Sequence, residues 1–578
     1  MELLQSIVGW LNTHVVELGF PVGGENVPFM VALLLGAGFY LTVYLGFIQL
    51  RKLGHGFAVT SGIYDDPDEP GDVSHFQALT TALSATVGIG NIAGVAIAIH
   101  LGGPGALFWM WMTAFLGMAT KYTEVTLAQH YRDVDAEGGK HKWEGSVSGG
   151  PMYYIERGLG PKWKPMAMFF AVMLAFTALL TGNAVQANTV ADNVQTVWGI
   201  PVWITGLVSA AFVGATILGG ITRIGKVTSI LAPLMAIIYV AGALFIIVRF
   251  YDQFFPAVLT IFREAFNPTS GVAGTGAGVF VMTMMWGVRR GLFSNEAGQG
   301  SAPIAHAAAK TDEPVSEGVV ALLEPFIDTI VICSMTGIVI VMTGMHTARF
   351  PTEVTLRGGD LSYTTLLESG RYVSTTPPAE IRIENGVHVE TGVGAALVSW
   401  HEASVDTLYA DGAMTQPFTG VVRPAEFQAV SDDGDTHASL WGNAAESGSP
   451  LTMAAFSQGL PGTWGNIVVL ISTILFAVST AISWSYYGDR CANYLMGHKA
   501  VLPYKFVYVL MHFVGAVVPL AVVWAMGDIA LAIVIIPNLI ALILLVPKVK
   551  DMTRSYFERR PWEENARMRK ELKARGSA

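Results

Sequence analysis

Eleven long apolar runs constrain the fold of this chain more than any other feature of its sequence. The hydrocarbon core of a membrane is roughly 30 Å thick, and a helix of about 20 mainly apolar residues crosses it. The sequence therefore predicts an all-α polytopic membrane protein with about eleven transmembrane helices. The predicted spans lie near residues 27–50, 77–100, 104–130, 165–189, 201–220, 228–250, 276–300, 317–345, 463–488, 503–524 and 527–547.

The composition supports a chain whose main partner is the lipid bilayer. Hydrophobic residues make up 52% of its 578 residues and charged residues only 13%, about half of the roughly 25% that is typical of globular domains. The formal net charge of −10 argues against a nucleic-acid partner, because no basic domain is available to neutralise phosphates. Cys333 and Cys491 are the two cysteines, and they indicate neither a disulfide framework nor a metal site.

Lys and Arg are concentrated in alternate loops between the predicted spans. The loops at 1–26, 101–103, 190–200 and 525–527 contain none of them, whereas the tail at 549–578 is rich in them. Positively charged loops stay in the cytoplasm. We therefore expect a multi-pass protein of the inner cell membrane, with an extracytoplasmic N-terminus and a cytoplasmic C-terminus. The sequence predicts that the tail itself forms an amphipathic or solvated helix.

One long segment, residues 347–450, interrupts the apolar pattern and contains no Lys. Within it, residues 381–389 alternate apolar and polar side chains around Asn385-Gly386, which is a strong hairpin signal. We expect a small extracytoplasmic β-rich insert. A long disordered loop is the alternative.

Two of the predicted spans are interrupted by glycine and polar residues. Residues 84–91 contain Gly88 and Gly90, and residues 291–303 add the carboxylate of Glu296. Glycine in a helix interior costs about 1 kcal/mol relative to alanine, and irregular backbone is tolerated in a membrane only inside protein or along an aqueous cavity. Tight helix packing explains one such segment, but it explains two less well.

The two interrupted spans are five spans apart. If residues 1–50 are set aside as an added N-terminal helix, the interrupted spans are the first and sixth of ten. Two inverted five-helix repeats, at 77–250 and at 274–346 with 451–548, produce this spacing. Secondary transporters are built in this way, and their broken helices bind an anionic substrate and a coupling cation. The spacing therefore favours a transporter.

The span at 463–488 offers hydroxyl groups for a cation. Ser479 and Ser483 share a helix face, with Thr480 beside them. Hydroxyl oxygens are hard ligands that suit Na⁺, although such side chains in membrane helices also bond back to the backbone.

Several long motifs resemble the alanine/glycine:cation symporter family, also called the sodium:alanine symporter family. The resemblance covers nearly all of the chain except the insert and parts of the tails. It implies a fold like that of the bacterial leucine transporter with one added N-terminal helix, and Na⁺-coupled uptake of alanine or glycine by alternating access. The insert is larger than the loop usual in the family, so its role is not inherited. The motifs are at residues 86–94, 102–111, 149–155, 290–298, 324–328 and 484–488.

The first helix of the leucine transporter is similar enough to carry positions across. The resemblance implies a Na⁺ site formed by the carbonyls of Ser84 and Val87 with Ser479 and Thr480. It also implies that backbone N–H groups around the first break receive the substrate carboxylate and that large aromatic side chains limit the substrate's size. The expected substrate-binding residues are Thr86, Gly88, Gly90, Asn91, Phe176, Phe293, Ser294, Asn295 and Trp484.

Acidic residues inside the spans are candidates for function by default. We favour pairing of Glu324 and Asp328 with the arginines at 289–290 over proton relay, because the hydroxyl site already accounts for coupling. Proton-coupled symport is nevertheless kept as the alternative. We expect Lys121 and Glu124 to form an interfacial charge pair near the end of their span.

Three other classes of protein are less well supported. A membrane metalloenzyme needs clustered ligands such as H-E-x-x-H, whereas the 13 histidines are scattered, so no catalytic residues are expected. A channel fits two broken helices less well than alternating access does. An extracytoplasmic amino-acid sensor is suggested only by the insert. The sequence leaves open the choice between alanine and glycine, the ion stoichiometry and the oligomeric state.

Overall fold

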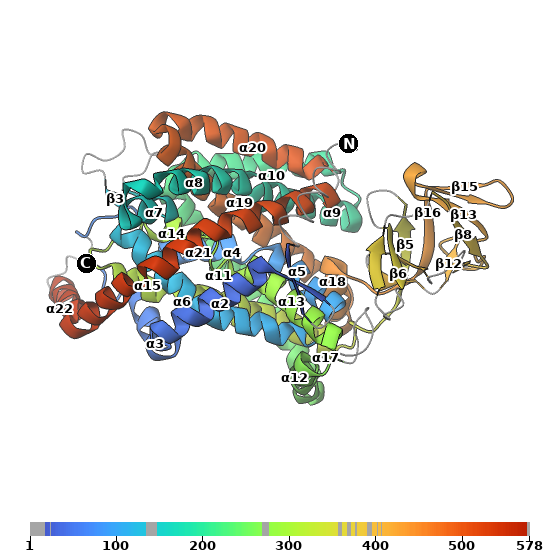
Figure 1. Cartoon of the computed structure of the whole chain (residues 1–578), viewed down its shortest axis with the longest axis horizontal. Coiled ribbons are helices and arrows are strands. Elements are labelled where there is room, and N and C mark those ends of the chain that lie inside the picture. The colour runs from blue at the N-terminus through green and yellow to red at the C-terminus, as the bar shows by residue number, and fades with distance from the viewer. Residues whose placement is uncertain are drawn as a thin grey trace.

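A helical body with a β-rich segment at one end makes up this computed structural model (Figure 1). All statements below concern the described residues, which are 18–22, 25–66, 68–134, 147–268, 277–356, 361–366, 372–375, 379–389, 396–400, 403–405, 407–518 and 520–574. Most of the predicted N-terminal segment at 1–26 and parts of the predicted insert at 347–450 lie outside them.

The described part of the chain begins with a short hairpin, β1 (Gly19–Val22) and β2 (Glu25–Pro28), which leads into the helices. Another two-stranded pair, β3 (Asp133–Val134) with β4 (Val147–Ser148), follows α6. The helices of the first half are α2 (Phe29–Tyr44), α3 (Ile48–Thr60), α4 (His75–Thr86), η2 (Ile89–Asn91), α5 (Ala93–Gly102), α6 (Ala106–His130), α7 (Pro151–Leu159), η3 (Pro161–Trp163), α8 (Lys164–Leu179), η4 (Leu180–Ala184), α9 (Val185–Trp198), α10 (Val202–Ile217), α11 (Gly220–Arg249) and α12 (Tyr251–Phe266).

The second half also contains both long and interrupted helices. One of its segments, η5, is π-helical, as η4 is in the first half. The helices of the second half are α13 (Ala277–Asn295), α14 (Ala302–His306), α15 (Pro314–Ala321), α16 (Leu323–Pro325), η5 (Phe326–Cys333), α17 (Ser334–Met342), α18 (Gly448–Gly459), α19 (Trp464–Met496), η7 (His498–Ala500), α20 (Val501–Val517), α21 (Leu520–Arg559) and α22 (Pro561–Ala574).

Each of the eleven predicted apolar runs coincides with a helix or with a set of consecutive helices. Among the described residues, six helices are long and apolar enough to cross a membrane, and two bent pairs raise the number to eight. One bent pair is α2 with α3, at 79°, and the other is α4 with the helix beginning at Ile89, at 61°. A multi-pass membrane protein is therefore confirmed, whereas the count of eleven stays a prediction.

Two helices occupy segments that we expected to be loop or insert. Helix α12 follows α11 directly, and its face is lined by exposed apolar side chains such as Phe255, 78% exposed, and Leu259, 68% exposed. Helix α18 begins at Gly448, immediately after the β-rich segment, and packs on α5 and α19. The predicted tail helix is confirmed as α22.

The insert is β-rich, as predicted, and its hairpin is in the predicted place. Strands β8 and β9 pair through Glu384 and Val387, and Asn385 and Gly386 between them both have positive φ, as a tight hairpin turn requires. The strands are β5 (Phe350–Thr355), β6 (Leu361–Leu366), β7 (Tyr372–Thr375), β8 (Ile381–Glu384), β9 (Val387–His388), β10 (Ala396–Trp400), β11 (Ala403–Ser404), β12 (Leu408–Tyr409), β13 (Gly420–Arg423), β14 (Gln428–Ser431), β15 (Thr436–His437) and β16 (Ser439–Ala444), with the one-turn helix η6 (Pro424–Glu426) before β14.

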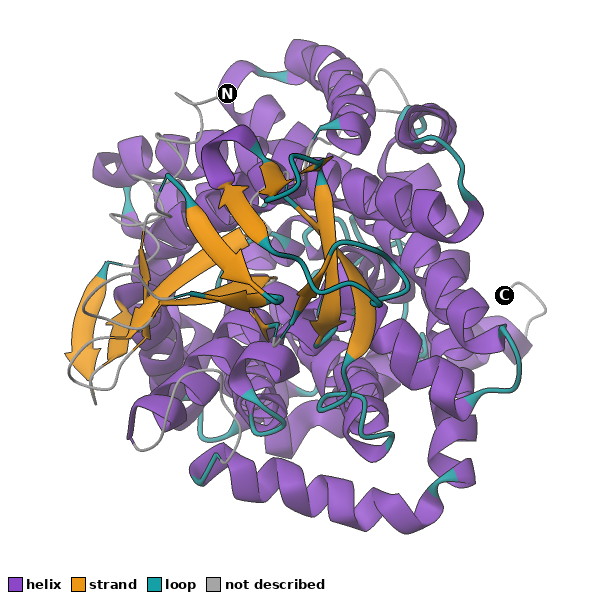
Figure 2. Cartoon of the chain, turned by 90° about the vertical axis from the view of Figure 1, so that its right-hand side faces the viewer, coloured by secondary structure: helices purple, strands orange, loops and turns teal. Residues whose placement is uncertain are grey.

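These strands form three antiparallel sheets, ordered β11-β10-β6-β7, β12-β16-β5 and β15-β14-β13-β8-β9. Strands β5 and β16 are the first and last of the insert, and Phe350 pairs with Ala444. The chain therefore leaves and re-enters the helical body at neighbouring points. The strands lie in front of the helices when the molecule is viewed from that end (Figure 2).

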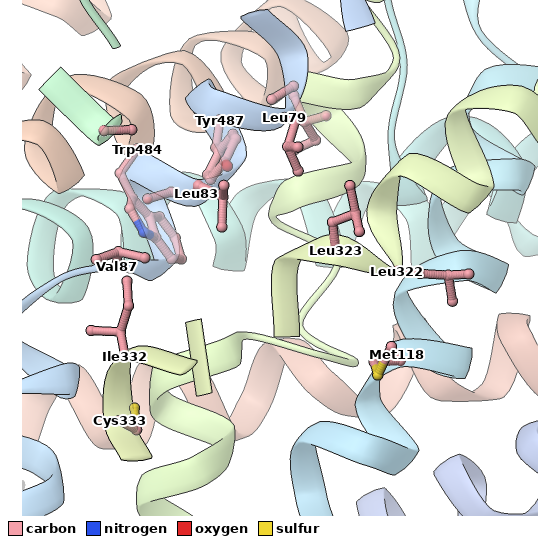
Figure 3. Close-up of a cluster of buried hydrophobic side chains, with 14 of the residues drawn as sticks. Leu79, Leu83, Val87, Met118, Leu322, Leu323, Ile332, Cys333, Trp484 and Tyr487 are labelled. Carbon is pink, nitrogen blue, oxygen red and sulfur yellow. The ribbon is translucent and has the colours of Figure 1, made fainter. Parts of the chain in front are cut away.

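Segments that we predicted to lie on opposite sides of the membrane lie at opposite ends of the helical body. The insert and α12 are at one end, and α3, β3 and α22 are at the other (Figure 1). We refer to this second end as the α22 end. Between the two ends, a large cluster of buried apolar side chains joins the helices, and its centre contains Val87, Leu323, Cys333 and Trp484 (Figure 3).

Candidate functional site

The first predicted break is present. Helix α4 starts with a reciprocal cap between Ser74 and Gln77 and ends at Thr86. The backbone is extended at Gly88 before η2 begins. Asn91 accepts the Gly88 N–H through its Oδ1 at 2.9 Å, so its side chain satisfies one of the backbone groups that the break exposes. The Gly88 N–H is therefore already hydrogen-bonded, which differs from the predicted free donor.

Helix α19 is joined to the last turn of α4 beside this break. The Thr480 hydroxyl donates to the carbonyls of Ser84, at 3.0 Å, and Ala85, at 3.2 Å, and the Ser479 hydroxyl reaches the Ser84 carbonyl at 3.4 Å. A Cβ added at Gly88 would lie only 2.8 Å from Thr480 Oγ1. The structure thus brings together three of the four predicted Na⁺ ligands. The side chain of Val87 packs in the core cluster, and the role of its carbonyl stays a prediction.

The second predicted break runs from Glu296 to Ser301, between α13 and α14. Glu296, Gly298 and Gly300 all have positive φ, which ends the regular helix. Polar side chains from distant helices bind the exposed backbone: Glu124 accepts the Gly300 N–H at 3.1 Å, and Asn538 donates to the Gly298 carbonyl at 2.8 Å. Residues on α6 and α21 therefore stabilise the irregular backbone of this break.

A small cavity lies where the two breaks meet. It includes the predicted residues Thr86, Gly88, Gly90, Phe293 and Trp484. Several other lining residues were not predicted from the sequence, and they come from η4, α9, the second break and α21. The lining residues are Ala85, Thr86, Gly88, Gly90, Thr181, Gln186, Phe293, Glu296, Gln299, Thr480, Trp484 and Leu531.

Trp484 forms one wall of this cavity and is fixed in place. Its indole Nε1–H donates to Glu296 Oε1 at 2.9 Å, and the Ser301 hydroxyl donates to the other Glu296 oxygen at 2.5 Å. Gly182 lies against the ring, since a Cβ there would be 2.3 Å from Trp484 Cγ. The indole therefore has one orientation, which is fixed by a hydrogen bond and by close packing.

Gln186 brings a second polar group to the cavity. Its Nε2 donates to the Thr181 carbonyl at 3.2 Å, and its buried Oε1 has no hydrogen-bond partner in the described structure. Buried polar atoms are usually satisfied, so this oxygen is available to a donor such as a substrate ammonium group. The π-helical turn η4 just before it was not predictable from apolar periodicity.

Phe176 is placed wrongly by the sequence analysis. Its side chain is 44% exposed on α8 and does not line the cavity. The buried face of α8 carries Phe170, Leu174 and Thr177, which follow helical spacing, and Phe176 lies outside that face. Thr181 and Gln186, farther along the same helical segment, line the cavity instead.

Asn91, Ser294 and Asn295 are buried near the breaks, but their side chains do not line the cavity. Asn91 donates to Asp328 Oδ1 at 2.6 Å, and Ser294 donates to Asp328 Oδ2 at 2.7 Å. Thr329 donates to the same oxygen. Asn295 Oδ1 instead accepts the N–H of Ala297 in the second break.

These donors form a cluster around the fully buried carboxyl group of Asp328, which we call the Asp328 cluster. Burying a carboxylate costs free energy unless a positive charge compensates it. In the described structure the Asp328 carboxyl group accepts hydrogen bonds from the Asn91 amide N–H and from the hydroxyl groups of Ser294 and Thr329, whereas the Asn91 side-chain oxygen accepts the Gly88 N–H. This cluster was not predicted from the sequence.

The remaining buried acids have partners different from those predicted. Glu324 contacts Lys121 Nζ at 3.0 Å and His306 Nε2 at 2.6 Å, so the predicted pairing of Glu324 and Asp328 with the arginines at 289–290 is wrong. The interfacial pair of Lys121 and Glu124 is also wrong. Both are fully buried, and Glu124 binds Asn538 and the second break.

Two broken helices that meet at a small polar cavity inside an apolar helical body define a membrane transporter of the secondary class. The comparison with known families is specific. Residues 10–366 and 425–570 match the sodium:alanine symporter family. The chain belongs to this family, which is a family of transporters and not of enzymes. The match leaves out residues 367–424, which lie within the insert.

Curated relatives align along almost the whole chain. A sodium/alanine symporter, AgcS of Methanococcus maripaludis, is 38% identical over 92% of this chain and 94% of its own length. A putative sodium/proton-dependent alanine carrier protein of Bacillus subtilis, YrbD, is 33% identical over 89% of this chain and 87% of its own. A probable sodium/glutamine symporter of the same organism, GlnT, is 30% identical over 91% and 88%.

Proposed function

We propose that this protein is a Na⁺-coupled symporter that carries alanine or glycine into the cell by alternating access. The observation that carries the proposal is the junction of Thr480 with the carbonyl of Ser84, one turn from the break at Gly88. An ion held there would touch α4 and α19 together, so its binding energy would favour one arrangement of the two helices.

The chemistry of the residues that line the cavity suits a small zwitterion. Thr86 and Gly90 lie on the side of the first break, where backbone N–H groups suit a carboxylate, whereas the Gly88 N–H is already bonded to Asn91. Glu296 and the free oxygen of Gln186, which lies beside Gly88, suit an ammonium group. Phe293 and Trp484 leave little room for a long side chain. The names of two relatives include alanine.

The layout that we propose is one added helix followed by two inverted repeats, at 77–250 and at 274–346 with 451–548. Its support is the position of the two breaks in the first helix of each repeat. We place the α22 end in the cytoplasm, because most of the loop Lys and Arg residues belong to that end. The insert is then extracytoplasmic.

Uptake by purified protein in liposomes tests the proposal. An inward Na⁺ gradient should accumulate labelled alanine or glycine, and replacing Na⁺ with K⁺ should abolish the accumulation. Accumulation that follows a pH gradient without Na⁺ would instead support the second candidate, a proton-coupled symporter. The carboxyl group of Asp328 favours that candidate, as does the name of the Bacillus subtilis relative, which includes both ions.

A further inference from the structure

Five ionisable side chains form a continuous buried network that plays no part in the sites described above. We call it the His306 network. His75 Nδ1 contacts one oxygen of Glu317, and His306 Nδ1 contacts the other at 2.5 Å. His306 Nε2 contacts Glu324 at 2.6 Å, and Lys121 contacts the second oxygen of Glu324 at 3.0 Å. None of the five is more than 3% exposed.

The contacts of the two histidines determine how many protons the His306 network holds. Each imidazole–carboxyl hydrogen bond contains one proton, and a neutral imidazole supplies only one N–H. His306 bonds carboxyl groups through both ring nitrogens, and His75 bonds one through Nδ1. Two neutral rings supply two of the three protons required. The arrangement therefore holds one proton more than neutral histidines and ionised glutamates would carry.

The His306 network joins helices that flank the two breaks. His75 is the first residue of α4, His306 is the last residue of α14, and Glu317 on α15 bonds both. Arg132 strengthens the same junction by donating to carbonyls on both sides of it, including those of Pro70 and Ala307. If α4 or α14 moves away from α15, at least one imidazole–carboxyl bond is lost.

Several other charged groups surround the His306 network and contribute to the electrostatic potential there. Asp65 and Glu69 lie near His75, and Arg132 lies near Glu317. Glu124 and Glu296 lie near Lys121. With Asp312 and Asp72, which also act on Arg132, these groups are acidic apart from the one arginine, so they favour retention of the additional proton.

We propose that His306, held between Glu317 and Glu324, is a proton-binding site whose additional proton is bound only while α4 and α14 are packed on α15. When these helix ends separate, water reaches the imidazole and it loses a carboxylate partner. A solvated imidazole is mainly neutral above about pH 7, so the proton leaves. The consequence for transport rests on the proposed symport: acid at the α22 end would hold that end closed, and alkali would release it.

The linkage sets the expected size of the effect. If one proton is bound in the packed state and lost in the opened state, the opened population rises by about tenfold per pH unit while the site is releasing its proton. The rise stops where the packed state itself is no longer protonated.

Hydrogen exchange of the purified full-length protein tests the site without any need for transport. Exchange of residues 72–80 and 302–317 is followed between pH 6 and 9 and corrected for the intrinsic exchange rate at each pH. We expect opening to increase by about one decade per pH unit in the wild type and to be nearly independent of pH in His306→Gln. His512→Gln is the matched control, because His512 is equally buried but bonds the neutral Asn183 and Ser209.

Two results would overturn the proposal: opening that does not depend on pH in the wild type, or the same slope in wild type and His306→Gln. Glu317→Gln serves if His306→Gln does not fold, since it removes the carboxylate that bonds both histidines, and it should flatten the slope as well. Absence of Na⁺-driven uptake would contradict the proposed function but not this site, because the exchange measurement reports on the helix ends alone.

Discussion

Trp484 donates its indole N–H to the carboxyl group of Glu296, and this bond joins the long helix α19 to the second helix break at 2.9 Å. The partners come from residues 188 positions apart in the chain. Trp484 is thereby a wall of the cavity and also the cap of an intramembrane acid. Since Thr480 lies one turn earlier on the same helix and bonds the end of α4, α19 contacts both breaks within about one turn.

The first prediction concerns the Na⁺ ligands. Thr480→Val keeps the shape of the side chain and removes its oxygen. Loss of a hydrogen-bonding or ligating oxygen at a charged group costs about 1.5–3 kcal/mol, so the Na⁺ concentration for half-maximal alanine uptake should rise by about tenfold or more. Ser479→Ala combined with this change should raise it further.

Thr473→Val is the control for that experiment, because Thr473 is also buried on α19 but has no hydrogen-bond partner in the described structure. Its Na⁺ dependence should match the wild type. If Thr480→Val shows the wild-type Na⁺ activation curve, the junction of α4 and α19 is not an ion site.

The second prediction concerns the first break. A Cβ at Gly88 would lie 2.8 Å from Thr480 Oγ1, and one at Gly90 would lie 3.1 Å from the Phe293 ring. Overpacking of this kind typically costs about 1–3 kcal/mol, and here it falls on the substrate cavity. Gly88→Ala and Gly90→Ala should therefore reduce uptake by about tenfold or more, and the valine variants should abolish it.

Gly36→Ala is the matched control for both glycines, since a Cβ at Gly36 meets no atom within 4 Å. It should transport normally. All variants are to be compared by size-exclusion profile and thermal unfolding, so that a loss of uptake is not confused with a loss of fold. Near-normal uptake by Gly88→Ala and Gly90→Ala would mean that these glycines serve helix packing.

The breaks were predictable from the sequence because their signal is local. Glycines beside Ser, Asn and Thr in an apolar run mark irregular backbone wherever the run packs, and the Asn385-Gly386 hairpin is equally local. The partners of the buried charges were not predictable. Lys121 and Glu124 are three residues apart and suggest a pair, yet their actual partners, Glu324 and Asn538, come from helices that only the tertiary fold brings close.

Phe176 shows a second limit of the sequence. An aromatic residue in the expected span was a reasonable cavity wall, but its direction depends on the rotation of α8. A uniformly apolar helix carries little information about rotation, because lipid and protein interior both accept apolar side chains. The π-helical turn at Leu180–Ala184 changes that rotation again before Gln186, and no apolar periodicity reveals it.

The third prediction concerns the insert. Phe350 and Ala444 are paired in neighbouring strands, so a short Gly-Ser linker can replace residues 351–443 without moving the helices. Because the cavity is lined only by residues of the helical body, Na⁺-driven uptake and its alanine affinity should be unchanged. A folded variant that has lost uptake or its response to alanine would support a sensing or gating role for the insert.

The last prediction concerns substrate size. Trp484 and Phe293 line the cavity together with Gly88 and Gly90, and each methylene group that a rigid pocket cannot accept costs about 1–3 kcal/mol. The wild type should therefore favour glycine and alanine over valine and leucine by large factors.

Trp484→Ala removes this wall and the hydrogen bond to Glu296, so it should weaken alanine uptake and improve the relative acceptance of larger amino acids. Trp484→Phe separates the two effects, because it keeps an aromatic wall and loses only the N–H donor. Its size preference should stay close to that of the wild type. The Na⁺ dependence should survive in both variants, since Ser479 and Thr480 remain. The measurement is competition of labelled alanine uptake by unlabelled glycine, alanine, valine and leucine. An identical selectivity profile in wild type and Trp484→Ala would show that the substrate's side chain does not face Trp484.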